Sequence, residues 1–308
     1  MPLPSQMNAR PDRRKAKPLL SLVAMLSAAV APLASWGQQP DPCANMQPPA
    51  GAKTLGYLHQ AFCVTPTLSD IATTNGSVSK LYSGMWYNTA PVSMSLYSMT
   101  DNVLTFANGG GLTTETRQSM PGALPLLLGS VGFYVEFAER LSDNDPDHWP
   151  AVWLMPQEHD IKQHDHAPTD PPGYERWVEL DVDEGGFNAG HHGALIYWYG
   201  KYPQYQKTNY GNDPPSTFGM DRTQEHVFGL SFDPVGKKVT WWVDGANVGS
   251  ASTENIPSLV NGYHYYLLIN NQSHKLNRPY KMYVRYFDAW TGGAVPKPPS
   301  GVRTETTP

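Results

Sequence analysis

The chain has 308 residues, of which 16% are charged and 11% are aromatic, and it contains 27 glycines and 29 prolines. Such a low charge content with so many turn-forming residues favours a fold built from short strands over a bundle of helices. The net charge of −5 disfavours nucleic acid and anionic membranes as partners, because both attract basic surfaces.

Residues 1–37 have the organisation of a secretory signal peptide. A basic stretch from Arg10 to Lys17 precedes an apolar run from Leu19 to Leu33, and Ser35-Trp36-Gly37 offers small residues at a cleavage site. The apolar run is too short for a spanning helix, although a retained membrane anchor is the alternative. Cleavage after Gly37 would leave 17 basic and 26 acidic residues, a net charge of −9, in a secreted or periplasmic protein that is free of the membrane.

Residues 38–66 are expected to form an N-terminal extension that is rich in proline at its beginning. The extension carries the two cysteines of the chain, Cys43 and Cys63. In an exported protein we expect them to pair in a disulfide that closes a loop of about 20 residues. Two free thiols are the alternative, and neither state makes the cysteines catalytic.

Residues 67–293 read as one large all-β domain, and residues 294–308, rich in proline and threonine, as a disordered tail. Short alternating or apolar runs recur through the domain, separated by turn signals such as Asp233-Pro234 and Asp244-Gly245. This pattern predicts a β-sandwich. The expected strands are 131–141, 149–155, 176–184, 192–199, 226–232, 238–243, 263–270 and 281–288.

The strongest functional signal is the run W-V-E-L-D-V-D-E over residues 177–184. Apolar Leu180 and Val182 alternate with acidic residues, which predicts a strand with one side in the core and an acidic side facing out. A row of like charges on one strand face costs electrostatic energy. Proteins that keep such a row use it to bind a cation or to perform acid/base chemistry on a sugar. The acidic residues are Glu179, Asp181, Asp183 and Glu184.

Several segments resemble glycoside hydrolase family 16, in the order found in that family. E-L-D-V-D-E at 179–184 is similar to the family motif E-x-D-x-x-E. H-W-P-A-V-W-L at 148–154, H-V-F-G-L-S-F at 226–232 with W-V-D-G at 242–245, and M-Y-V-R-Y-F at 282–287 are similar to other strands of the family. The resemblance implies a concanavalin-like jelly roll, a sandwich of two antiparallel sheets.

The same resemblance assigns Glu179 as the nucleophile and Glu184 as the acid/base of a retaining glycosidase, with Asp181 between them. It implies an endo-acting β-glycan hydrolase that needs no cofactor and has a polysaccharide as its partner. The expected substrate is a β-1,3- or mixed-linkage β-1,3-1,4-glucan. An agarase or carrageenase of the same family is an alternative, although sulfated polymers would require basic residues in the cleft. We expect a monomer.

The spacing of the motif requires a distortion of the strand. Retaining enzymes hold their two carboxyl groups about 5–5.5 Å apart, but in a regular strand Glu184 would point away from the face of Glu179. A β-bulge would bring Glu184 onto that face. Without a bulge, the shorter Asp183 would lie on the face of Glu179 in place of Glu184. Members of the family usually have an apolar residue at the position of Asp183. The alternatives are therefore a jelly roll that binds carbohydrate without cleaving it, or a cation site made by the same acids.

Aromatic side chains near the motif are expected to bind sugar rings by stacking. Trp177 lies two residues before Glu179 and shares its strand face, and Trp153 lies on an expected neighbouring strand. For any single tryptophan of a β-sandwich, packing in the core is an equally good explanation. The candidates for substrate binding are Trp86, Trp149, Trp153, Trp177 and Trp198.

Histidines form the last group of candidates. H-G-A-L-I-Y at 192–197 is similar to a family strand that reads H-G-x-x-H-Y, with Ile196 in place of the second histidine. His192 is therefore a candidate for substrate binding, and a solvated turn histidine is the alternative. The connection 156–174 carries histidines and aspartates at 159–166, but their spacing matches no tight metal pattern. We expect this loop to border the cleft without a metal.

Overall fold

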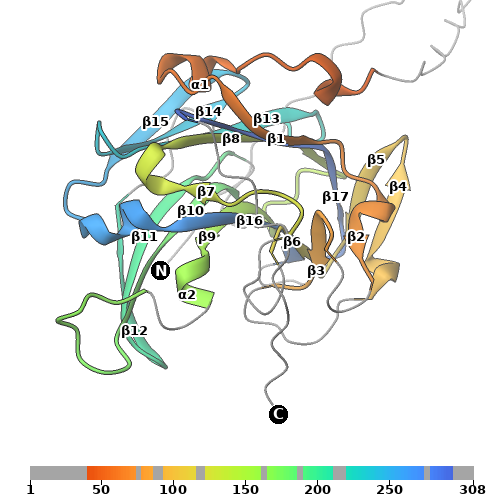
Figure 1. The fold of residues 1–308 in the computed structure, drawn as a ribbon. Helices are drawn as coiled ribbons and strands as arrows, with labels where there is room; N and C mark the ends of the chain where they lie inside the picture. Colours follow the sequence, from red (N-terminus) through yellow and green to blue (C-terminus); the bar gives the residue numbers. More distant parts are fainter. Residues whose placement is uncertain are drawn as a thin grey trace, which may run out of the picture. The chain divides into compact units, whose positions relative to one another are not determined.

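The computed structural model describes residues 40–73, 78–85, 93–115, 122–160, 165–185, 190–210, 220–273 and 278–293. The expected signal peptide (1–37), the expected tail (294–308) and Trp86 lie outside these ranges. Within them, two β-sheets pack face to face around one large apolar core (Figure 1).

The first sheet has eight strands in the order β15-β14-β13-β8-β17-β5-β4, with β1 paired to β17. All of its pairings are antiparallel. Its strands are β1 (His59–Val64), β4 (Tyr97–Thr100), β5 (Val103–Ala107), β8 (Phe133–Leu141), β13 (His226–Asp233), β14 (Lys238–Val243), β15 (Ala246–Ser252) and β17 (Lys281–Thr291).

The second sheet has nine strands in the order β12-β11-β10-β9-β16-β6-β3-β2, with β7 paired to β16. Its pairings are antiparallel except for the short parallel pair β2–β3. Its strands are β2 (Ile71–Ala72), β3 (Leu81–Ser83), β6 (Gly110–Thr113), β7 (Leu127–Leu128), β9 (His148–Pro156), β10 (Glu175–Glu184), β11 (Ala194–Lys201), β12 (Gln204–Asn209) and β16 (His264–Ser273).

Helices in the described ranges are short connectors. None of them has the length and apolar character needed to cross a membrane. The α-helices are α1 (Ala50–Thr54) and α2 (Gln157–Asp160), and the 3-10 helices are η1 (Pro42–Asn45), η2 (Leu68–Asp70), η3 (Met94–Leu96), η4 (Gly129–Val131) and η6 (Ser258–Gly262).

The predicted all-β sandwich of the concanavalin-like jelly-roll type is confirmed. Every strand expected from the sequence is present with ends shifted by a few residues, as β8, β9, β10, β11, β13, β14, β16 and β17. The strands that the sequence did not reveal are short, or they are edge strands such as β12 and β15. Most residues of β12 and β15 are partly or fully exposed, so their side chains show no apolar alternation that would mark a strand.

Aromatic residues from both sheets fill the core. Phe133 of β8 stacks on Phe232 of β13 with 5.5 Å between ring centroids, and Tyr265 of β16 packs against both rings from the other sheet. These side chains are essentially fully buried, and burial of apolar area at about 25 cal/mol per Å² is the main force that holds the sheets together.

The N-terminal segment covers the outer face of the first sheet. Helix α1 lies over β8, β13 and β15 (Figure 1), and Ala52, Tyr57 and Trp242 form a second small apolar cluster there with Tyr134 and Trp290. The predicted disulfide Cys43–Cys63 is confirmed, with 5.5 Å between the Cα atoms. It joins η1 to β1, and β1 is hydrogen bonded to β17. The end of the expected extension, residues 59–64, is therefore a strand of the sandwich itself.

Candidate active site

The first part of β10 is a regular strand. Residues 175–181 pair one for one with residues 200–194 of β11. Because side chains alternate along a regular strand, Trp177, Glu179 and Asp181 project from one face, while Leu180 is fully buried in the core on the other.

The second part of β10 contains the bulge that the motif spacing predicted. On the β9 side, Asp181 lies opposite Trp153, whereas Glu184, three positions further on, lies opposite Ala151, only two positions away on β9. One extra residue on β10 is the defining feature of a β-bulge. Trp153 and Ala151 share a face of β9, so their partners Asp181 and Glu184 share a face of β10. The side chain of Glu184 is thereby on the same face as Glu179.

Backbone groups that the bulge removes from the ladder find partners elsewhere. Trp241 of β14 donates its indole N–H to the carbonyl of Asp181 at 2.8 Å, and His191 donates from Nε2 to the next carbonyl, also at 2.8 Å. The amide of Glu184 donates to the carbonyl of His192 at 2.7 Å. Because buried backbone groups without partners are costly, these contacts stabilise the bulged conformation.

Asp183, the unusual residue of the bulge, is fully buried and points away from the acidic face. Its carboxylate accepts hydrogen bonds from Arg222 at 2.5 and 3.3 Å, and Arg222 also donates to Glu139 of β8 at 2.8 Å. Burial and the charge of Asp183 raise the pKa of Glu139 to about 8. Although burial opposes its charge, the two acids hold the pKa of Arg222 above its usual value. The guanidinium of Arg222 is thus the positive partner of this buried acidic group.

Two indoles hold the glutamates of the face. Trp198 of β11 donates to Glu179 at 2.7 Å, and Trp149 of β9 donates to Glu184 at 2.9 Å. A third indole, that of Trp153, lies between them on β9 and donates to Asn270 of β16 at 2.7 Å. The glutamate side chains are therefore fixed in position by donors from the strands on either side of β10.

The three acids of this face all resist ionisation. Burial raises the pKa of Glu179 to about 7, against the hydrogen bond from Trp198 and with a further rise from the charge of Glu184. Burial and the charges of both glutamates raise the pKa of Asp181 well above its usual value, and burial raises the pKa of Glu184 against the hydrogen bond from Trp149. Burial thus favours the protonated form of each of the three acids, and a protonated Asp181 spares the face a third negative charge.

The structure places the predicted aromatic residues in different environments. Trp149 and Trp198 are partly exposed, whereas Trp153 is 8% and Trp177 only 3% exposed. The ring of Trp177 stacks on Trp198 at 5.7 Å and on His159 at 3.7 Å. Protein thus covers Trp177, and its ring supports that of Trp198.

His192 is buried near Glu184 rather than solvated in a turn. Its side chain is 3% exposed, and its charge would favour the ionised form of Glu184. Its carbonyl also accepts the hydrogen bond from the Glu184 amide described above. His192 therefore lies near Glu184, and its role in substrate binding stays a prediction.

Sequence reasoning missed the residues that come from other strands. Arg222 precedes β13, and nothing local distinguishes it from a solvated arginine. The signal that could have found it is Asp183, because a carboxylate that a bulge turns into the core requires a buried positive partner. Lys207 of β12 was also missed. Its ammonium lies 5.0 Å from the centre of the Trp198 ring, and its charge favours the ionised form of all three acids on the face.

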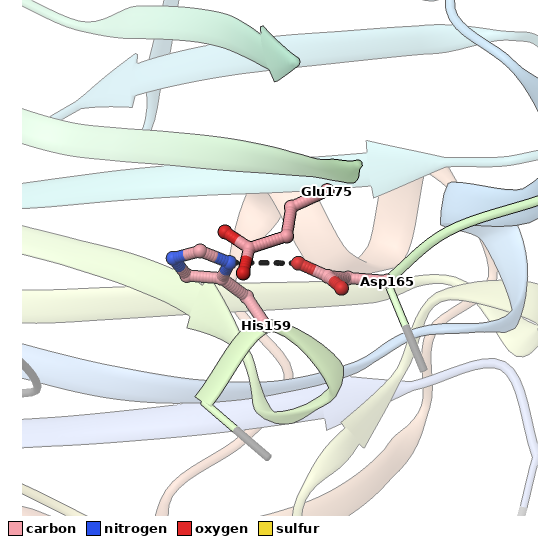
Figure 2. A group of neighbouring side chains, drawn as sticks. All are labelled: His159, Asp165 and Glu175. Carbon is pink, nitrogen blue, oxygen red and sulfur yellow. Dashed lines mark hydrogen bonds and ion pairs between the residues drawn. The ribbon is translucent and has the colours of Figure 1, made fainter. Parts of the chain in front are cut away.

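One group of described residues could hold a metal ion. His159, Asp165 and Glu175 each offer a ligand atom, and these atoms lie within 4.8 Å of one another (Figure 2). The group is at the start of β10, on the other side of Trp177 from the acids of the bulge region.

Comparisons with known proteins give matches among solved structures alone. No family model matches the sequence, and neither does any curated protein. The laminarinase from Rhodothermus marinus is 15% identical, with a TM-score of 0.43 over 69% of this chain and 90% of that chain. The κ-carrageenase from Pseudoalteromonas carrageenovora is 16% identical, with a TM-score of 0.45 over 65% and 83%. A family 16 protein of a mixed-linkage glucan system from Bacteroides ovatus is 14% identical, with a TM-score of 0.43 over 64% and 86%. The likeness is one of fold.

Proposed function

We propose that the protein is a retaining endo-β-glycan hydrolase of family 16 type, with Glu179 as nucleophile and Glu184 as acid/base. The observation that carries the proposal is the bulge between Asp181 and Asp183. It turns Glu184 onto the face of Glu179 and directs Asp183 to Arg222 instead. A regular strand would have put the shorter Asp183 on the face of Glu179 instead, and that pair would be farther apart than the roughly 5–5.5 Å that double displacement requires.

The proposed mechanism has two steps. The carboxylate of Glu179 attacks the anomeric carbon, the glycosidic bond breaks, and Glu184 gives its proton to the departing oxygen. Glu184, now ionised, then takes a proton from a water molecule, which attacks the same carbon and releases Glu179. Asp181, whose raised pKa keeps it neutral, avoids a third negative charge and can donate its proton in a hydrogen bond to Glu179.

Sugar rings would bind on the residues that surround the acids. Trp149 and Trp198 bond through their indole N–H inside the protein but stay partly exposed, which leaves parts of their rings for stacking. Trp153, which is 8% exposed, has less of its ring to offer a sugar. In this proposal His192 contacts the sugar that binds beside Glu184. In this proposal Trp177 does not contact the sugar but stacks on the ring of Trp198 and holds it in position.

A β-1,3- or mixed-linkage glucan is the substrate class that we propose, since the acidic chain has few cations to offer a charged polymer. One observation favours a second candidate, a sulfated galactan of the carrageenan type. Lys207 is exposed, lies over Trp198 and faces the three acids, and could pair with a sulfate group at the edge of the site. Secretion is part of the proposal and is supported by the disulfide, which forms in oxidising compartments.

The decisive experiment uses the purified protein on laminarin, lichenan, agarose and κ-carrageenan, with reducing ends as the readout. We expect Glu179→Gln and Glu184→Gln to bind the cleaved glycan but to lose at least about 1,000-fold in rate, because each removes a group that acts in the transition state. The matched control is Glu254→Gln, which changes a surface glutamate that is 71% exposed.

Each outcome has a distinct meaning. Cleavage by the protein and by the control, but not by the two site variants, supports the proposal. Glycan binding without release of reducing ends from any polymer would favour the carbohydrate-binding jelly roll. Full activity of Glu179→Gln with unchanged folding would contradict the assignment of the nucleophile.

A further inference from the structure

We propose that His159, Asp165 and Glu175 form a site for a divalent transition metal ion, with Zn²⁺ as the ion that fits best. The role inferred for the ion is structural, to fasten the connection between β9 and β10 onto the start of β10. This site is separate from the acids of the bulge, and the proposal does not depend on the proposed hydrolase activity.

The three side chains converge from three different segments. His159 comes from α2, Asp165 from the loop that follows, and Glu175 from the first position of β10, and all three point to one spot (Figure 2). Nδ1 of His159 lies 2.8 Å from Oδ2 of Asp165. Zinc bonds of about 2.0–2.2 Å would hold ligand atoms roughly 4 Å or less apart. The observed separations, within 4.8 Å, therefore need a movement of an ångström or less.

An unsatisfied carboxylate oxygen is the second, independent observation. Asp165 has no exposed surface, and its Oδ1 atom has no hydrogen-bond partner among the described residues. A buried carboxylate oxygen without a partner is expensive. A bound cation is the simplest group that would satisfy it, because metal ions and ion pairs are the usual companions of buried charges.

The donor set has the right charge and softness for zinc. Two carboxylates neutralise a divalent ion, and a neutral imidazole supplies the nitrogen that distinguishes zinc sites from the all-oxygen sites of calcium and magnesium. Among the described residues, the ion pair that His159 forms with Asp165 is the one that involves either Asp165 or Glu175. The hydroxyl of Tyr205 donates a hydrogen bond to Glu175 and would orient this ligand from the second shell of the ion.

Solvent can reach the site from one side. Glu175 is only partly buried, and it lines a surface pocket together with His166, Pro168 and residues 170–174. An ion can therefore enter without unfolding of the sandwich, and a water molecule on this side would complete a four-coordinate site.

The site would act on the glutamate face through stacked rings. His159 stacks on Trp177 at 3.7 Å, Trp177 stacks on Trp198, and Trp198 donates to Glu179. An ion that fixes the imidazole of His159 would also restrain Trp177, which stacks on it, and through Trp177 the ring of Trp198. The metal thus strengthens one wall of the site without touching the substrate.

The test is a metal-binding measurement on the purified protein, first stripped with a chelator and then dialysed. We expect mass spectrometry of elements to find about one Zn²⁺ per chain after dialysis against dilute zinc, and the melting temperature to rise with Zn²⁺ and fall with chelator. Asp165→Asn should weaken zinc binding more than about 100-fold, since loss of even an outer partner costs 10–100-fold. Glu175→Gln, at a less buried position, provides the same test if Asp165→Asn does not fold.

The matched control is His264→Gln, which breaks another histidine–carboxylate pair, that with Glu158, outside the group. It should bind zinc as tightly as the unchanged protein. The absence of a melting-temperature shift with Zn²⁺ or Mn²⁺ at tenfold excess would overturn the proposal, and so would equal weakening of zinc binding in His264→Gln and Asp165→Asn. Both outcomes are independent of whether any glycan is cleaved.

Discussion

In the first half of β10, residues 175–181, the direction of each side chain follows from strand alternation, whereas in the second half, residues 181–184, it follows from a bulge. The first half pairs one for one with β11 and needs no help from the rest of the chain. The second half is held by Trp241, His191 and Arg222. A local pattern thus places Glu179, and distant residues place Glu184.

This difference predicts which substitutions should disrupt the candidate site. Substitutions that weaken packing around the regular half should change stability and rate by modest amounts, because pairing with β11 remains. Substitutions that remove support from the bulge should allow the strand to become regular, which would turn Glu184 toward the core. The following predictions proceed from the largest expected effect to the smallest.

Arg222→Met should destabilise the protein by about 3–5 kcal/mol, because it leaves Asp183 and Glu139 buried without their positive partner. Chemical denaturation measures the loss. The double variant Arg222→Met with Asp183→Leu should recover most of this stability, since an apolar replacement of a buried ion pair is often neutral.

The surface pair Arg278–Asp145 provides the control for this prediction. Arg278→Met should change the unfolding midpoint far less, because exposed ion pairs contribute little. An unfolding midpoint of Arg222→Met equal to that of Arg278→Met would show that the buried charges do not hold the bulge.

Gly193→Ala tests the contact of Trp241 with the bulge. A Cβ atom at position 193 would lie 2.2 Å from Nε1 of Trp241, the atom that donates to the Asp181 carbonyl. Overpacking of this kind costs about 1–3 kcal/mol, and we expect the rate of glycan cleavage to fall with it.

Gly262→Ala is the matched control, because its Cβ atom would meet nothing within 4 Å. Thermal denaturation and cleavage assays on both variants make the comparison. If both alanine variants melt and cleave alike, the indole of Trp241 is not needed for the bulge.

Trp198→Phe tests the regular half and should have the smallest effect, a loss of about tenfold in kcat/KM with little change in stability. The hydrogen bond from Trp198 lowers the pKa of Glu179, which burial raises to about 7. Loss of this donor should raise that pKa further. Since the nucleophile must be ionised, the acidic limb of the pH profile of kcat/KM should move to higher pH.

The control for the pH profile is Trp290→Phe, which removes an indole that donates to Asp288 on the far side of the first sheet. It should leave the acidic limb in place. If the acidic limb of Trp198→Phe moves to lower pH or does not move, that limb does not report the ionisation of Glu179.

Much of the fold could be predicted from the sequence, and the reason lies in periodicity. Strands such as β8 and β16 contain apolar runs, Phe133–Val135 and Tyr265–Ile269, and the acids of β10 alternate with Leu180 and Val182. The resemblance to glycoside hydrolase family 16 makes Glu179 and Glu184 partners, and their spacing then predicted the bulge. Polar edge strands such as β12 carry no such pattern, and so the approach of Lys207 to Trp198 could not be foreseen.

Other parts of the site depend on contacts between distant segments. Arg222 meets Asp183 only because the two sheets fold together. The group of His159, Asp165 and Glu175 is not compact in sequence, since its third member follows a long connection and belongs to β10. The expectation that this loop holds no metal was based on the spacing of residues 159–166 alone, which omits Glu175.

The most direct test of the central claim is proton NMR of the first product formed from the glycan that the protein cleaves. If Glu179 and Glu184 act on opposite sides of one bond, as the bulge allows, the new reducing end appears first as the β-anomer, and the α-anomer follows only through mutarotation. An α-anomer in the earliest spectra would mean direct displacement by water and would contradict the account.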